Sequence, residues 1–156
     1  MHRSMPRADF RFVFRRRVRY SEVDAQAVVY FARYLEWADV GVVEYWRAAG
    51  IFDRAGITGG EVEFHVVRAE IDYKAPMLLD EEVDICVAAT RIGRTSADFL
   101  CELHGAGARD GVEDLRARIF QVQVHVAQAR GAPAPVPDWI VKAFEDYEGR
   151  PLKEAR

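Results

Sequence analysis

Residues 30–49 read YFARYLEWADVGVVEYWRAA, and this stretch decides the fold. Its apolar residues recur at steps of three and four, which is the period of an α-helix. These positions are Phe31, Tyr34, Leu35, Ala38, Val42, Tyr45 and Ala49. Trp37, Val40 and Trp46 widen the apolar surface beyond one stripe, so we expect a helix over this range that is buried on more than one side. Gly50 is suited to end it.

Alternation of apolar and polar residues, which is typical of half-buried strands, appears on both sides of that helix. The strands are expected at about residues 10–20, 62–73, 83–89, 97–103 and 115–127. Arg16 interrupts the apolar face of the first strand, and a bulge or an exposed strand end would accommodate it. The alternation changes phase at Val66 and Val67, which predicts a bulge in the second strand. Prolines 133, 135 and 137 then stop the sheet.

The order of elements is one strand, one long apolar helix and four further strands. Most of those strands are joined by turns of hairpin length, so the sheet should be mainly antiparallel. An α+β fold follows, with about five strands wrapped around one buried helix. We expect a single domain over residues 1–156 with a core at about 10–130, and a short C-terminal helix over 138–147 that Asp138 caps.

Composition excludes several classes of protein. Half of the residues are hydrophobic and the formal net charge is −3, which argues against disorder and gives no electrostatic footprint for nucleic acid or anionic lipid. No segment approaches the roughly 20 apolar residues that a membrane span needs. The N-terminus lacks the apolar region of a signal peptide, so we expect a cytoplasmic protein.

No metal or cofactor site is expected from the motifs. Cys86 and Cys101 lie in apolar, strand-like runs and are interpreted as small buried side chains. His65, His104 and His125 lack the spacing of a metal set and are interpreted as structural. The chain contains no phosphate loop, dinucleotide fingerprint or nucleophile elbow.

The most informative segment for chemistry is residues 20–31, YSEVDAQAVVYF, which joins the first strand to the helix. Asp24 in such a junction would lie beside the free backbone N–H groups of the helix start. Those groups can stabilise a developing oxyanion, while the carboxylate attacks a carbonyl or activates a water. The alternative is that Asp24 caps the helix or interacts with its dipole.

Residues 19–50 resemble the signature of the 4-hydroxybenzoyl-CoA thioesterase family, including its YbgC-like acyl-CoA thioesterases. The pattern of an acid, any residue and Asp, followed by small and apolar residues and an aromatic helix start, is met by residues 22–31. Three further segments match: IDYKAP at 71–76, DEEV at 80–83 and RIGRTS at 91–96. The resemblance covers about residues 10–140.

The resemblance implies a hotdog fold that forms a homodimer or homotetramer, with active sites at the subunit interface. It implies hydrolysis of an acyl-CoA thioester, with no cofactor beyond the CoA of the substrate. Asp24 matches the catalytic carboxylate, acting as nucleophile or general base. Phe31 matches the position whose backbone N–H faces the thioester oxygen, which leaves its side chain free for the core. Ala27, Val28 and Tyr30 would contact the substrate.

Two residues depart from the family pattern. Ala27 stands where the family has Gly, and a positive φ there would cost a non-glycine residue about 1 kcal/mol or more. Glu22 stands where Asp is common. We interpret it as solvated or salt-bridged, with a supporting role beside the site as the alternative.

Arg91 and Arg94 flank a turn and are candidates to hold the phosphates of CoA, because guanidinium groups bind such anions well. Thr95 would add a hydroxyl, and the alternative is a solvated hairpin tip. Alternative functions are a thioesterase for acyl-carrier-protein substrates and a non-catalytic acyl-CoA binding module. An enoyl-thioester hydratase is disfavoured because no His follows a suitable Asp by five residues. The acyl group stays open.

Overall fold

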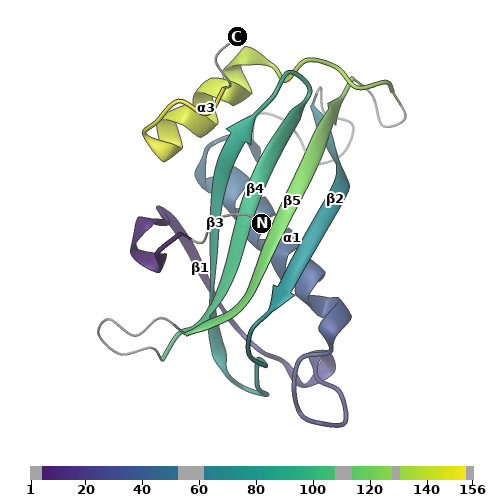
Figure 1. Ribbon diagram of the computed structural model, residues 1–156, viewed down its shortest axis with the longest axis vertical. Coiled ribbons are helices and arrows are strands. Elements are labelled where there is room, and N and C mark those ends of the chain that lie inside the picture. The colour runs from purple at the N-terminus through teal and green to yellow at the C-terminus, as the bar shows by residue number, and fades with distance from the viewer. Residues whose placement is uncertain (1–4, 53–61, 108–113, 128–130, 154–156) are drawn as a thin grey trace.

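The computed structural model describes residues 5–52, 62–107, 114–127 and 131–153. They form a five-stranded antiparallel sheet with the long helix α1 across one face (Figure 1). The strands are β1 (Phe12–Arg17), β2 (Glu63–Tyr73), β3 (Glu82–Ile92), β4 (Ser96–Gly105) and β5 (Leu115–Val126). The helices are α1 (Tyr34–Ala48) and α3 (Asp138–Glu148), with 3₁₀ turns at Arg7–Asp9, Tyr20–Glu22 and Phe31–Arg33. The strand order is β1-β3-β4-β5-β2.

The predicted α+β layout is therefore confirmed, with differences at helix ends. The α1 helix begins at Tyr34 rather than Tyr30, because residues 31–33 form a 3₁₀ turn. Gly50 has a φ of 74° and ends the helix as predicted. The prediction that Asp138 caps α3 was wrong, since Asp138 is the first helical residue and Pro137 occupies the cap position. None of the described helices is long and apolar enough to span a membrane.

The predicted bulge in β2 is confirmed. The pairing of β2 with β5 shifts between Val66 and Arg68. Before the shift Val66 pairs with Gln123, and after it Ile71 pairs with Ile119. Partners directly across a ladder share a face, so the bulge keeps both halves of β2 turned toward α1.

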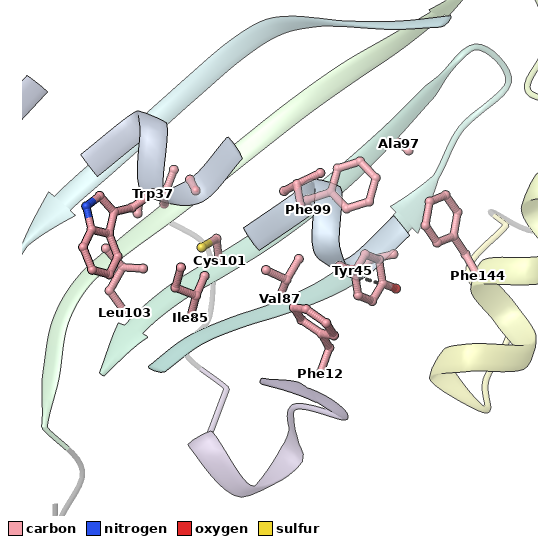
Figure 2. Packing of buried hydrophobic residues seen from close by; sticks show 14 of the residues in the cluster. Phe12, Trp37, Tyr45, Ile85, Val87, Ala97, Phe99, Cys101, Leu103 and Phe144 are labelled. Atoms are coloured by element: carbon pink, nitrogen blue, oxygen red, sulfur yellow. Dashed lines mark hydrogen bonds between the residues drawn. The ribbon is translucent and has the colours of Figure 1, made fainter. Parts of the chain in front are cut away.

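The core lies between α1 and the middle of the sheet. Figure 2 shows buried side chains of α1, such as Trp37 and Tyr45, among residues of β3 and β4. The ring of Tyr45 is stacked on Phe144 of α3, with centroids 5.6 Å apart. Gly41 marks the closest approach of helix to sheet, because a Cβ at this position would run into the side chain of Ile85.

The opposite face of the sheet is covered by charged pairs and by the N-terminal segment. Phe10 packs there with Cys86, Ala88 and Leu100. Glu102, almost fully buried, accepts a hydrogen bond from Arg118 at 2.9 Å and lies 3.0 Å from the ring of His104. Both cysteines are buried and free, as predicted, and burial raises the pKa of Cys86 to about 11.

The outer edge of β2 is open. Within the described part of the chain no strand pairs with that edge, and most side chains of β2 are exposed. They include Val66 and Val67, which are 52% and 61% exposed. Long edge strands with exposed apolar side chains are surfaces on which another strand can pair.

Replacement of Gly41 by Val should lower the free energy of unfolding by about 1–3 kcal/mol, because the added side chain overlaps Ile85 of β3. The matched control is Ala48→Val at the exposed end of the same helix, where loss of helix propensity costs about 0.7 kcal/mol at most. Urea denaturation of both variants measures the difference. Equal losses in the two variants would show that the close contact at Gly41 is unimportant.

Candidate active site

Asp24 lies in a tight loop between Val23 and Val29, two residues that pair in an antiparallel bridge. Its backbone N–H donates to the carbonyl of Val28 at 3.0 Å. Its side chain is exposed, and one carboxylate oxygen accepts the backbone N–H of Gln26 at 2.8 Å. Neither the 3₁₀ turn nor α1 has a side-chain cap, so the alternative in which Asp24 caps the helix is contradicted.

The connection between β2 and β3 holds this loop in place. Val29 donates its N–H to the carbonyl of Met77 at 2.9 Å, and Leu79 donates to the carbonyl of Ala27 at 3.1 Å. Val28 and Leu78 form a further antiparallel bridge. Backbone hydrogen bonds to residues 77–79 thus hold one side of the loop, while the Asp24 carboxylate stays accessible to solvent.

Ala27 has a φ of 60°, in the left-handed region that favours glycine. A positive φ is the condition under which alanine was expected to be less favourable than the glycine of the family pattern. The loop therefore carries backbone strain next to the candidate carboxylate, where a glycine would have none.

The entrance of α1 follows the loop. Phe31 is the first residue of the 3₁₀ turn, so its backbone N–H has no partner inside that turn. Its side chain is 62% exposed and packs beside Tyr30, with ring centroids 4.8 Å apart. The prediction that the Phe31 side chain belongs to the core was wrong. The expected role of its backbone N–H, which is to face the thioester oxygen, does not depend on where the ring lies.

A hollow of about 300 Å³ opens at this entrance. Its lining is mostly apolar: Val28, Val29, Phe31, Tyr34, Tyr73, Lys74, Ala75 and Pro76. The hydroxyl of Tyr73 donates to the carbonyl of Phe31 at 2.9 Å. Burial raises the pKa of Tyr34, whose hydroxyl accepts the N–H of Met77, so that the phenol stays neutral. Val28 and Phe31 therefore border one space, and Asp24 lies in the adjoining loop.

Comparison with known proteins identifies the family. The model of the thioesterase-like superfamily matches residues 18–144, which is most of the chain. The chain belongs to the thioesterase-like superfamily. The predicted relationship to 4-hydroxybenzoyl-CoA thioesterases is thereby confirmed, together with the hotdog fold that solved members share.

Three known proteins to which this chain is similar are the following. A 1,4-dihydroxy-2-naphthoyl-CoA hydrolase from Nostoc punctiforme is 27% identical, with 93% of this chain and 97% of the relative covered. A Thermus thermophilus thioesterase, solved with coenzyme A and Zn, is 27% identical with a TM-score of 0.75, over 92% and 98% of the two chains. A 1,4-dihydroxy-2-naphthoyl-CoA thioesterase from Synechocystis shares the fold, with 22% identity, a TM-score of 0.76 and coverage of 86% and 96%.

The hairpin candidates of this thioesterase-like chain lie away from Asp24. Arg91, Arg94 and Thr95 are at the β3–β4 turn, while the Asp24 loop is bonded to residues just before β3. An 11-residue strand separates the two places by about 33 Å. Arg91 lies 3.4 Å from Asp98, and Arg94 is exposed. Within one chain the structure does not bring these residues to the carboxylate.

A second hollow of about 290 Å³ lies at that far end, between α1 and the start of β2. Its lining is Asp39, Val42, Val43, Trp46, Phe52, Val62, Glu63, Phe64, Val66 and Gln123. The rings of Trp46 and Phe64 meet edge to face, with centroids 5.0 Å apart. Asp39 was not predicted as a site residue, because an acidic residue on a helix is ordinarily solvated. Only the three-dimensional structure shows that it lines a hollow.

The interpretation of Glu22 as a salt-bridged residue is confirmed. Glu22 is buried rather than solvated, and its carboxylate pairs with Arg16. Arg16 itself needs neither a bulge nor an exposed strand end, because its charge is met by that carboxylate.

Replacement of Ala27 by Gly should raise the free energy of unfolding by about 1 kcal/mol, since glycine adopts a positive φ without strain. Ala25→Gly in the same exposed loop is the control. Ala25 has no positive φ, so glycine there should cost about 0.4–1 kcal/mol through the entropy of the unfolded chain. Chemical denaturation measures both variants. A loss of stability in Ala27→Gly would contradict the strain described for this turn.

Proposed function

We propose that this chain is an acyl-CoA thioesterase that hydrolyses a thioester to a free acid and CoA, with Asp24 as its catalytic carboxylate. The observation that carries the proposal is the exposed carboxylate on a hydrogen-bonded loop, next to a helix entrance with a hollow and with a backbone N–H, that of Phe31, which has no partner inside its own 3₁₀ turn. Membership of the superfamily supports it, as do a relative named as a 1,4-dihydroxy-2-naphthoyl-CoA hydrolase and a similar thioesterase that was solved with coenzyme A.

The chemistry follows from the groups that surround the hollow. The Asp24 carboxylate either attacks the thioester carbonyl carbon or removes a proton from the water that attacks it. Negative charge then develops on the carbonyl oxygen, and the backbone N–H of Phe31 and the positive end of the helix stabilise it. The thiolate of CoA leaves as the carbonyl re-forms and takes up a proton. Where Asp24 is the nucleophile, water then hydrolyses the mixed anhydride to the free acid and restores the carboxylate; where Asp24 is the base, the free acid forms directly. Coenzyme A enters this scheme only as part of the substrate.

The active unit in this proposal is a homodimer that pairs through the open edge of β2. Antiparallel pairing about a twofold axis sets the Tyr73 end of one β2 beside the Glu63 end of the other. The helix entrance of one subunit then adjoins the Trp46–Phe64 hollow of its partner. That hollow, which combines aromatic and aliphatic side chains with polar ones, would receive the acyl group, and Asp39 would accept a hydrogen bond from a hydroxyl on an aromatic acyl ring.

The same pairing accounts for the distant hairpin residues. Arg91, Arg94 and Thr95 lie at the Glu63 end of the sheet, so those of the partner subunit would approach the Asp24 end. Guanidinium groups there would bind the phosphates of CoA. Val28 and Tyr30 would contact the thioester portion, and Ala27 would shape the turn beneath it.

Replacement of Asp24 by Asn should lower kcat by about 10²- to 10⁴-fold, since the shape is kept while the base or nucleophile is lost. Release of free thiol from benzoyl-CoA, 1,4-dihydroxy-2-naphthoyl-CoA and butanoyl-CoA measures it. The control is Asp146→Asn, an exposed carboxylate on α3 that should leave kcat unchanged. A kcat of Asp24→Asn equal to that of the wild type would contradict the proposed catalytic role of Asp24.

The same panel, extended with acyl-carrier-protein thioesters, separates the alternatives. Faster hydrolysis of the carrier-protein substrates would favour a carrier-protein thioesterase. Tight binding of acyl-CoA without any thiol release by the wild type would favour a binding module.

Replacement of Val67 by Asp should turn the dimer into a monomer and lower activity at least tenfold, because an unpaired charge at a paired edge is costly. Val13→Asp, which adds the same charge to an exposed position of the opposite edge strand, should leave the dimer intact. Sedimentation equilibrium gives the masses. A dimer that survives Val67→Asp with full activity would contradict the proposed interface.

A further inference from the structure

Arg16 and Glu22 form an ion pair that is sheltered from solvent, at the base of the Asp24 loop. A guanidinium nitrogen of Arg16 donates to one carboxylate oxygen of Glu22 at 2.5 Å. The side chains are 21% and 5% exposed. A buried charge is stable in a fold when it has a partner, because an isolated one loses its solvation without compensation.

The same guanidinium reaches the helix. It lies over the ring of Trp37, 4.4 Å from the centroid, and Trp37 is fully buried in the first turns of α1. A cation over an aromatic face is attracted by the ring, more strongly where water is excluded. Arg16 thus connects β1, the loop and α1 through one side chain.

Glu22 is bonded at both ends of the loop. Its second carboxylate oxygen accepts the backbone N–H of Arg19 at 2.8 Å, before the loop. Its backbone carbonyl accepts the N–H of Tyr30 at 3.0 Å, after the loop and next to Phe31. Glu22 therefore holds both the segment that carries the Asp24 carboxylate and the segment that leads to the Phe31 N–H.

We propose that Arg16 and Glu22 are a positioning pair, which sets the Asp24 carboxylate against the backbone N–H of Phe31. The inference rests on the proposed thioesterase function. The only side-chain hydrogen bond of Asp24 among the described residues is to the nearby Gln26 N–H, so its direction is inherited from the loop backbone. A misplacement of a catalytic group by about 1 Å lowers the rate by about 100-fold.

The first test is Glu22→Gln, which keeps the shape and removes the charge. It should lower kcat for the fastest substrate of the acyl-CoA panel by about 10- to 100-fold, with KM changed less than about threefold. The assay is run well below the thermal midpoint of the variant, so that all molecules are folded. A kcat equal to that of the wild type would overturn the proposal.

The second test is Arg16→Met combined with Glu22→Gln. Removing both charges leaves none unpaired, so the thermal midpoint should recover relative to either single variant. The kcat should stay as low as in the single variants, because each of them already breaks the pair. Recovery of kcat together with the thermal midpoint would show a structural role alone.

The matched control is Glu102→Gln, which removes a buried carboxylate paired with Arg118 on the opposite face of the sheet. It should lower the thermal midpoint like Glu22→Gln and leave kcat unchanged. An equal fall of kcat in both variants would mean that activity merely follows stability, and would overturn the positioning role.

Hydrogen exchange separates this inference from the proposed function. Glu22→Gln should speed exchange of the Tyr30 and Asp24 amides at least about tenfold, while Glu102→Gln should not. Unchanged exchange would contradict the positioning pair whatever the activity. If exchange rises as expected but Asp24→Asn keeps full kcat, the proposed role of Asp24 fails and the pair still orders the loop.

Discussion

Burial of α1 against the middle strands is the constraint on which the candidate site depends. The helix approaches β3 so closely at Gly41 that a side chain there would overlap Ile85. With the helix axis fixed in this way, its first residues stand beside the β2–β3 connection that holds the Asp24 loop. The loop and the helix entrance are thus placed by a packing contact far from the chemistry.

The α+β layout could be predicted from the sequence because the apolar residues of each helix and strand recur at the period of that element. The bulge in β2 was visible as a change of phase, and the register shift lies where the phase changes. The start of α1 was misjudged because a 3₁₀ turn and an α-helix place apolar residues at similar steps. Asp138 was misjudged as a cap because capping depends on backbone angles that the residue type does not reveal.

The site was only partly visible in the sequence. The Asp24 loop was singled out because its residue pattern is specific, and the glycine that the family has at position 27 suggested the positive φ that Ala27 adopts. The exposure of Phe31 was missed, since periodicity cannot separate a core residue from one left for another surface. Arg16 and Glu22 each looked irregular, but only the three-dimensional structure shows that they belong together.

The bulge in β2 has a consequence for the wall of the second hollow. Because side chains alternate along a strand, removal of the single extra residue at Val67 would turn Phe64 and Val66 through half a rotation, onto the charged side of the sheet. Trp46 would then lose its facing ring, and the space beside it would open to water. The extra residue at Val67 therefore determines that Phe64 and Val66 lie on the α1 side of the sheet, where the second hollow forms.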